Sequence, residues 1–193
     1  HDDNFLRTTG IDQKLYQLDS TQFEAYNQAN IWMDWEKQVT PTLRQSLNIM
    51  HDFDHLEVEV KAVDTQVQAE KLIAELQQQL RGFEHTAVIT SFDLKIHHAL
   101  ILQNTHFKHG LLIENDIGEK AIEQAIELQC CQIGWMNQLA TDEIIKTTQK
   151  AGLAVSVWTV NDIERAKHLR NLKIDGLITD FPKMMQIALE QIK

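Results

Sequence analysis

The segment LEVEVK, residues 56–61, alternates apolar and charged side chains with the two-residue period of a β-strand. The alternation puts three apolar side chains on one face and three charged ones on the other, Glu57, Glu59 and Lys61. A strand with one charged face usually turns that face to water. Here a helical pattern follows every predicted strand, so the outer face of the sheet has to be apolar. We therefore expect the charged row to point to the inner side of the sheet.

The chain after this strand repeats one pattern, an apolar strand-like run followed by a helical stripe. The further runs are residues 86–92, 109–114, 131–136, 153–160 and 175–180. Their centres lie roughly 21 to 30 residues apart, which is the length of one β-plus-α unit in a parallel sheet. The sequence therefore predicts an α/β fold of six such units.

Two architectures fit this pattern, a doubly wound open sheet and a (β/α)8 TIM barrel. Neither GxGxxG nor GxxxxGK[ST] follows any of the strands, which weakens the nucleotide-binding form of the open sheet. We predict a TIM barrel in which residues 1–193 form a single domain that supplies about six of the eight units. The other two units, roughly 40 to 60 residues, are expected before His1. The domain is thus predicted to be N-terminally incomplete.

The first 50 residues are more polar than the rest of the chain. The segment PTLRQSL, residues 41–47, predicts a helix that begins at Pro41 and leads into the first strand. Residues 10–40 are too many for an ordinary barrel loop. We interpret this stretch as an excursion at the barrel mouth, where specificity is often built; the alternative is a surface insertion with no role.

The composition limits the partners and the location. Hydrophobic residues make up 43% of the chain and the net charge is −10, so a broad nucleic-acid-binding surface is not expected. No apolar run is long enough for a membrane span, and no leader is visible.

Cys130 and Cys131 are neighbours and cannot easily pair, so we predict two buried structural thiols in a cytoplasmic protein. His97 and His98 fall in a predicted helix and are expected at its surface, since no zinc-like spacing of histidines occurs.

Four residues near predicted strand ends could carry chemistry. Glu59 and Lys61, at the carboxyl end of their strand, could hold a hard cation and an anionic substrate oxygen, or could form a structural ion pair. Trp158 could be a flat apolar wall or part of the core. Asp180 fits best as a cap of the last helix.

Six blocks in order resemble those of the glycerophosphodiester phosphodiesterase family. They are HDDNFLRTTG (1–10), VTPTLRQSL (39–47), LEVEVK (56–61), TSFD (90–93), VSVWTVND (155–162) and IDGLITDFP (174–182). Each block is weak alone, but six in the same order along nearly the whole chain is a strong signal. In the family, HRG, PENT and ExD segments come before the first of these blocks, and the given sequence has none of them ahead of that block.

The resemblance implies metal-dependent hydrolysis of glycerophosphodiesters to sn-glycerol 3-phosphate and an alcohol, in glycerophospholipid or glycerol metabolism. It implies that His1 is one of two acid/base histidines and that Glu59 is one of three carboxylate ligands of Ca²⁺ or Mg²⁺. It further implies that Lys61 contacts the phosphate and that Trp158 lines the glycerol pocket. The remaining ligands and the second histidine are expected in the segment before His1.

Two alternatives stay open beside this hypothesis. One is a catalytically inactive barrel that binds phosphorylated glycerol compounds or a partner chain. The other is a phospholipase of the sphingomyelinase D type, which shares the barrel and the metal carboxylates. The expected partner is a small-molecule glycerophosphodiester substrate, and a homodimer is compatible with the sequence.

Overall fold

The computed structural model describes residues 4–32 and 34–190. The chain divides into two compact units, one that ends at Asp52 and one that begins at Phe53. Within the described residues, no helix combines the length and the apolar character that crossing a membrane requires.

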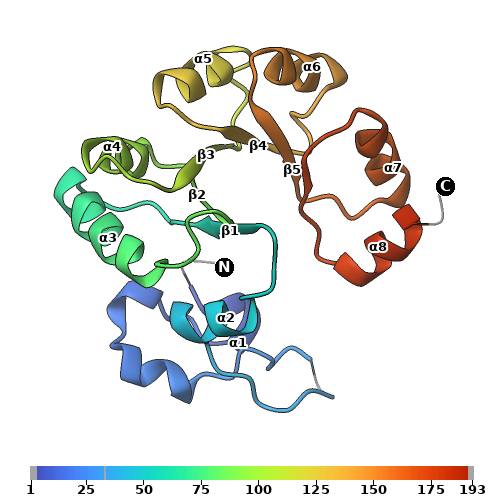
Figure 1. The fold of residues 1–193 in the computed structure, drawn as a ribbon. Helices are drawn as coiled ribbons and strands as arrows, with labels where there is room; N and C mark the ends of the chain where they lie inside the picture. Colours follow the sequence, from blue (N-terminus) through green and yellow to red (C-terminus); the bar gives the residue numbers. More distant parts are fainter. Residues whose placement is uncertain (1–3, 33, 191–193) are drawn as a thin grey trace. The chain divides into compact units, whose positions relative to one another are not determined.

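The second unit is built on one sheet whose strands follow the order of the sequence. The strands are β1 (Leu56–Glu59), β2 (Ala87–Ser91), β3 (Lys108–Ile113), β4 (Gln132–Met136), β5 (Ala154–Trp158) and β6 (Gly176–Leu177). All neighbouring strands pair in parallel. The sheet curls into half of a barrel, as predicted, and Figure 1 shows the strands along the inside of an arc with the helices along its outside. The predicted strand at residues 175–180 is shorter than expected, since pairing covers Gly176–Leu177.

A helix follows each strand. The helices are α3 (Gln66–Gln79), α4 (Leu94–Leu102), α5 (Lys120–Glu127), α6 (Asp142–Lys150), α7 (Ile163–Asn171) and α8 (Pro182–Glu190). Local side chains fix several of their starts, because the free N–H groups of a first turn need acceptors. Thr65, Thr141 and Asp162 each accept a backbone N–H from the first turn of α3, α6 and α7.

The hydrophobic core lies between the sheet and these helices. Alternate residues of the central strands, such as Ile133, Val155 and Val157, are fully buried there. They meet apolar helix residues such as Ile145 and Leu169, which are buried to the same degree. The apolar outer face expected from the strand–helix alternation is therefore present.

The inner side of the sheet carries polar side chains, as LEVEVK predicted. Gln132 of β4 donates a hydrogen bond from Nε2 to Oε1 of Glu57 on β1, over 3.0 Å. Because β2 and β3 separate these two strands, the contact crosses the hollow of the curl. Gly176 of β6 is also near, since a Cβ there would lie 3.8 Å from the same Glu57 oxygen. The charged row of β1 thus points inwards.

Two predictions about single side chains were wrong. His97, expected at the surface of its helix, is completely buried. Cys130 is buried and both cysteines are free thiols, but Cys131 is only partly buried. An imidazole can be buried at low cost when it is neutral and hydrogen-bonded, which is the case for His97.

The first unit contains short helical segments joined by loops. They are α1 (Leu6–Thr9), η1 (Leu15–Gln17), η2 (Ser20–Ala25) and α2 (Leu43–Ile49). Phe5 stacks on Tyr26 with ring centroids 4.9 Å apart. The predicted helix at residues 41–47 is found as α2, with Thr42 as its cap.

Side-chain amides tie the excursion at residues 10–40 to the RTTG segment. The Gln28 Oε1 accepts a hydrogen bond from the Thr8 hydroxyl over 2.6 Å, and the Gln28 Nε2 donates one to the Thr40 hydroxyl over 2.8 Å. The Asn30 amide donates to the backbone carbonyl of Thr9. Beyond these contacts, Trp32 and Trp35 expose 49% and 68% of their surface.

Candidate active site

Glu59 and Lys61 form an ion pair at the carboxyl end of β1. The Lys61 Nζ lies 2.6 Å from the Glu59 Oε1, and the two side chains are 46% and 31% exposed. A pair as exposed as this one contributes only about 0–1 kcal/mol to stability. Both charged groups therefore remain accessible to a ligand at the end of the sheet where barrel enzymes carry out catalysis.

The two carboxylates of LEVEVK lie at opposite ends of the strand. Glu57 is near the amino end of β1, where it contacts Gln132 and His55. It lines a cavity of about 440 Å³ among the amino ends of the strands. Only Glu59 lies at the catalytic end, so the two residues have different surroundings on one face of one strand.

Trp158 ends β5 and is partly exposed. Its indole Nε1 donates to the Gly134 carbonyl on β4 over 3.0 Å. Its ring meets the edge of Phe92, which follows β2, with centroids 5.4 Å apart and planes at 85°. Because β2 and β5 are not neighbours, this contact lies on the inner side of the sheet. Trp158 is thus held with an apolar surface toward the barrel mouth, and Phe92 is a partner that sequence reasoning missed.

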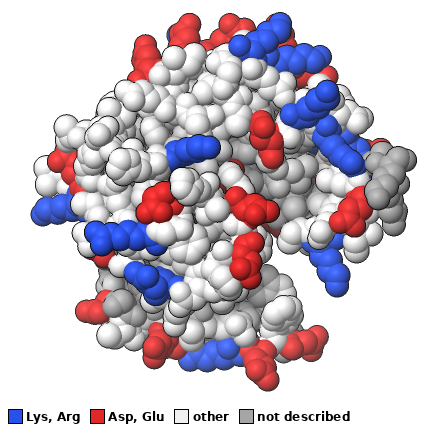
Figure 2. Space-filling model, in the orientation of Figure 1, with Lys and Arg blue, Asp and Glu red and all other residues white. Residues whose placement is uncertain are grey.

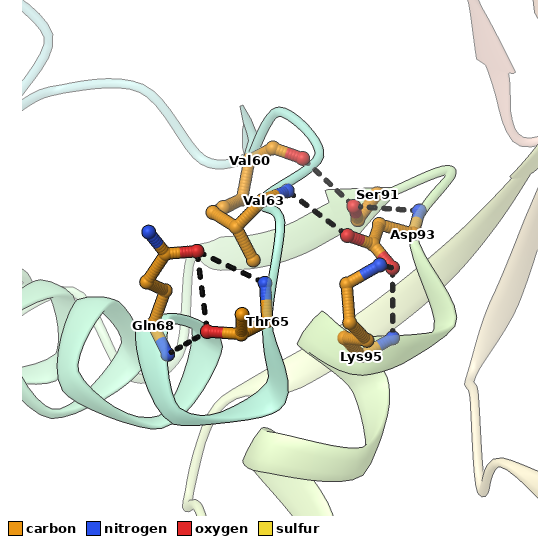
Figure 3. Close-up of polar contacts among 7 residues, drawn as sticks. All are labelled: Val60, Val63, Thr65, Gln68, Ser91, Asp93 and Lys95. Atoms are coloured by element: carbon orange, nitrogen blue, oxygen red, sulfur yellow. Dashed lines mark hydrogen bonds and ion pairs between the residues drawn. The ribbon is translucent and has the colours of Figure 1, made fainter. Parts of the chain in front are cut away.

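The loop that carries Lys61 is held by the end of β2 (Figure 3). The Ser91 hydroxyl donates to the Val60 carbonyl over 2.7 Å and accepts the Asp93 N–H over 3.0 Å. The Asp93 Oδ2 in turn accepts the Val63 N–H over 3.0 Å. Lys61 therefore sits between two anchored residues, so its backbone position is well defined.

Asp93 is held as an anion in this loop cluster. Burial by itself raises the pKa of its carboxyl group, but hydrogen bonds from the Val63 and Lys95 N–H groups and the nearby Lys95 ammonium outweigh that effect. The net result is a pKa below the ordinary value of an aspartate. Figure 3 also shows the Thr65–Gln68 capping box that starts α3 directly after this loop.

Asn161 connects the ends of β5 and β6. Its Oδ1 accepts the Thr179 hydroxyl and the Asp180 N–H, each over 3.0 Å, and its Nδ2 donates to the Asp180 carboxylate over 2.7 Å. Asp180, predicted as a cap of the last helix, is thus engaged by Asn161, while α8 begins later at Pro182. These contacts join the WTVN and ITD blocks at the carboxyl ends of the two strands.

The structure describes three of the four site residues predicted from the sequence, which are Glu59, Lys61 and Trp158. Glu59 and Lys61 lie together, and Trp158 lies at the same end of the sheet. His1 falls outside the described residues. Glu59 offers a carboxylate, which is the kind of ligand that Ca²⁺ and Mg²⁺ prefer. On the face seen in Figure 2, acidic and basic side chains are interspersed, so the net charge of −10 is not gathered in one patch there.

Comparison with known proteins decides the family. The model of the glycerophosphoryl diester phosphodiesterase family matches residues 1–184. The chain belongs to this family. It is 26% identical over 195 residues to YhdW of Bacillus subtilis (strain 168), a candidate glycerophosphodiester phosphodiesterase, with 94% of this chain and 76% of that protein covered.

Solved structures agree on the fold of this family member. An Oleispira antarctica phosphodiesterase in complex with the product sn-glycerol-3-phosphate matches with a TM-score of 0.82 and 19% identity, over 98% of this chain and 78% of the other. A glycerophosphodiester phosphodiesterase from Parabacteroides distasonis matches with a TM-score of 0.78 and 19% identity, over 100% and 78%. At such identities the likeness shows the TIM-barrel fold.

Proposed function

We propose that the protein to which this chain belongs hydrolyses glycerophosphodiesters to sn-glycerol 3-phosphate and an alcohol, with the help of Ca²⁺ or Mg²⁺. The observation that carries the proposal is the accessible Glu59–Lys61 pair at the carboxyl end of β1, in a chain of the glycerophosphoryl diester phosphodiesterase family. The product named for the Oleispira antarctica structure, sn-glycerol-3-phosphate, supports the same substrate class.

The chemistry of the substrate explains why these side chains suit it. A phosphodiester is anionic, so its charge repels a nucleophile and its leaving alkoxide needs a proton. The Lys61 ammonium can donate hydrogen bonds to a phosphate oxygen and reduce that charge. The Glu59 carboxylate fits a hard divalent cation, which when bound would polarise the phosphate.

Trp158 and His1 also belong to the proposed site. The apolar face of Trp158 would pack against the glycerol carbons, and Phe92 would hold the indole in place. His1 would give a proton to the leaving alkoxide, because imidazole titrates near neutral pH and is a poor ligand for a hard cation.

We assign the reaction to glycerophospholipid or glycerol metabolism. We also propose a cytoplasmic location, which the two free thiols support.

Glu59→Gln with Glu57→Gln as its control tests the proposal. Both variants remove one carboxylate from the same face of β1, but only Glu59 lies at the catalytic end. Release of sn-glycerol 3-phosphate from sn-glycero-3-phosphocholine should fall by roughly 10²-fold or more in Glu59→Gln, in line with loss of a key electrostatic group. It should stay near the wild-type rate in Glu57→Gln.

Metal binding and melting temperature are measured on the same samples. Glu59→Gln should weaken binding of Ca²⁺ and Mg²⁺ while it melts close to the wild type. If the wild-type protein binds glycerol 3-phosphate but hydrolyses no glycerophosphodiester, the enzyme hypothesis is wrong and the protein is an inactive binding protein. Equal activity in Glu59→Gln and wild type would leave Glu59 as a structural residue only.

A further inference from the structure

His97, His109 and Cys130 bring three metal-binding atoms together in the buried layer between sheet and helices. His97 comes from α4, His109 from β3, and Cys130 from the segment before β4; their exposed fractions are 0%, 6% and 7%. One ligand atom from each lies within 4.8 Å of the other two. The cluster is on the outer side of the sheet, away from the inward-pointing row of β1.

The spacing of these atoms matches a tetrahedral metal site. His97 Nδ1 lies 3.0 Å from His109 Nδ1, and the Cys130 Sγ lies 3.8 Å and 3.6 Å from those two nitrogens. Zinc bonds of about 2.0–2.1 Å to nitrogen and about 2.3 Å to sulfur put tetrahedral ligands about 3.3 Å apart for two nitrogens and about 3.6 Å apart for nitrogen and sulfur. Shifts of a few tenths of an ångström would therefore centre a zinc ion.

The contact of the second His97 nitrogen favours the same conclusion. His97 Nε2 lies 3.1 Å from the Ser91 carbonyl oxygen, which can only accept. Nε2 therefore carries the hydrogen, and Nδ1 presents its lone pair to His109 and Cys130. A ring nitrogen that donates to a backbone carbonyl while the other faces the metal is the usual arrangement of a metal-binding histidine.

Burial changes the protonation of the three side chains in different ways, in favour of metal binding for the two imidazoles and against it for the thiol. Burial, helped by His97, lowers the pKa of His109 to about 4, and burial also lowers the pKa of His97. Both imidazoles are thus neutral near pH 7 and able to bind a metal. Burial, helped by Cys131, raises the pKa of the Cys130 thiol to about 12, so the thiol is protonated without a metal and a metal has to displace that proton in order to bind.

We propose that His97, His109 and Cys130 form a buried Zn²⁺ site that ties α4 to β3 and β4. Imidazole and thiolate ligands suit Zn²⁺ and do not suit Ca²⁺ or Mg²⁺, so this site is distinct from the one proposed at Glu59. Three protein ligands leave a fourth tetrahedral position for a water molecule.

The chain contains matched controls for two of the ligands. Cys131 is adjacent to Cys130, and the exposed His98 is adjacent to His97, but neither belongs to the cluster. Zinc content would be measured in the purified protein and after chelation and titration with Zn²⁺. Wild type, Cys131→Ser and His98→Ala should bind one equivalent, whereas Cys130→Ser and His97→Ala should lose at least about tenfold in affinity, since even partners of metal ligands cost that much.

Binding of cobalt can be measured on the wild-type protein, so this test does not depend on whether a variant folds. Co²⁺ added to the chelated wild-type protein should produce a thiolate charge-transfer band, and Zn²⁺ should abolish that band and raise the melting temperature. Excess Mg²⁺ or Ca²⁺ should do neither. The site is refuted if the wild-type protein shows neither the band nor the rise in melting temperature, or if Cys131→Ser loses zinc as strongly as Cys130→Ser. Because none of these measurements uses hydrolysis, they are independent of the function proposed above.

Discussion

The Asp93 carboxylate accepts the backbone N–H of Val63 over 3.0 Å, so the end of β2 holds the loop that follows β1. Val63 is two residues from Lys61, and Asp93 belongs to the TSFD segment, one of the six blocks on which the resemblance to the family was based. In this chain the Asp93 carboxylate therefore has a structural role, which is to position the loop that carries Lys61.

Asp93→Asn should lower the free energy of unfolding by roughly 1–3 kcal/mol near neutral pH. The two carboxylate oxygens of Asp93 accept the N–H groups of Val63 and Lys95, and in asparagine one of these oxygens is replaced by an NH₂ group, which cannot accept. Urea unfolding measures the loss. Asp116→Asn, an exposed aspartate that also accepts a backbone N–H, is the control and should change stability much less. A stability equal to that of wild type would mean that the Val63 contact contributes nothing.

The loss should depend on pH in a defined direction. The pKa of Asp93 is below its ordinary value in the folded protein, so its anion stabilises the fold above the pKa of an unfolded aspartate, near 3.8. That contribution disappears as the pH falls through the lower, folded pKa. Wild type and Asp93→Asn should therefore differ above pH 5 and converge in strong acid, which unfolding curves over a pH series would detect.

Lys61→Met should weaken binding of sn-glycerol 3-phosphate by roughly 1.5–3 kcal/mol, the range for a hydrogen bond to a charged group. Methyl phosphate should lose a similar amount, because the contact is to the phosphate. Titration calorimetry measures both ligands. Lys108→Met is the control, since Lys108 starts β3 at the opposite end of the sheet. An unchanged affinity in Lys61→Met would exclude the phosphate contact.

Trp158→Ala should lower the affinity for sn-glycerol 3-phosphate by roughly 1.5–3 kcal/mol, through loss of an apolar wall. Methyl phosphate has no glycerol carbons and should bind almost as well as before. The difference between the two ligands separates a glycerol pocket from a general loss of structure. If both ligands weaken equally, Trp158 does not contact glycerol.

His1→Ala should reduce turnover by roughly 10²- to 10⁴-fold, the usual effect of removing a general acid or base. Binding of Ca²⁺ or Mg²⁺ should change little, because imidazole is a poor ligand for these ions. The control is His51→Ala, an exposed histidine that is 3.1 Å from Asp52. Loss of the bound cation in His1→Ala would instead make His1 a metal ligand.

The parallel sheet and its polar inner side could be predicted because each strand is an apolar run of definite length and period. The contact of Glu57 with Gln132 confirms the inward orientation of LEVEVK, which its alternation and the helix after each strand had together indicated. The order of the six strands follows from the regular strand–helix repeat, since such units add side by side. Strand length at β6 was less predictable, because local sequence does not determine where pairing stops.

The buried histidines could not be predicted in the same way. His97 was treated as a polar residue on a helix, and polarity usually indicates the surface. Its burial depends on His109 and Cys130, which lie 12 and 33 residues away in the sequence. A usable signal was present in the strand, since His109 alternates with the buried residues Leu111 and Ile113 on the outward row of β3.

The pairing of every strand with its neighbour in the sequence has a consequence for how the protein folds. Paired residues are separated by 20 positions between Val88 and Lys108 and by 31 between Leu56 and Ala87. Loop-closure entropy grows only slowly with loop length, so each new strand joins at a similar entropic cost. The pairing partner of each of the strands β2 to β6 has therefore already been synthesised when that strand leaves the ribosome. Each strand that has paired presents an open edge until the next unit pairs with it, and such an edge can pair with another chain.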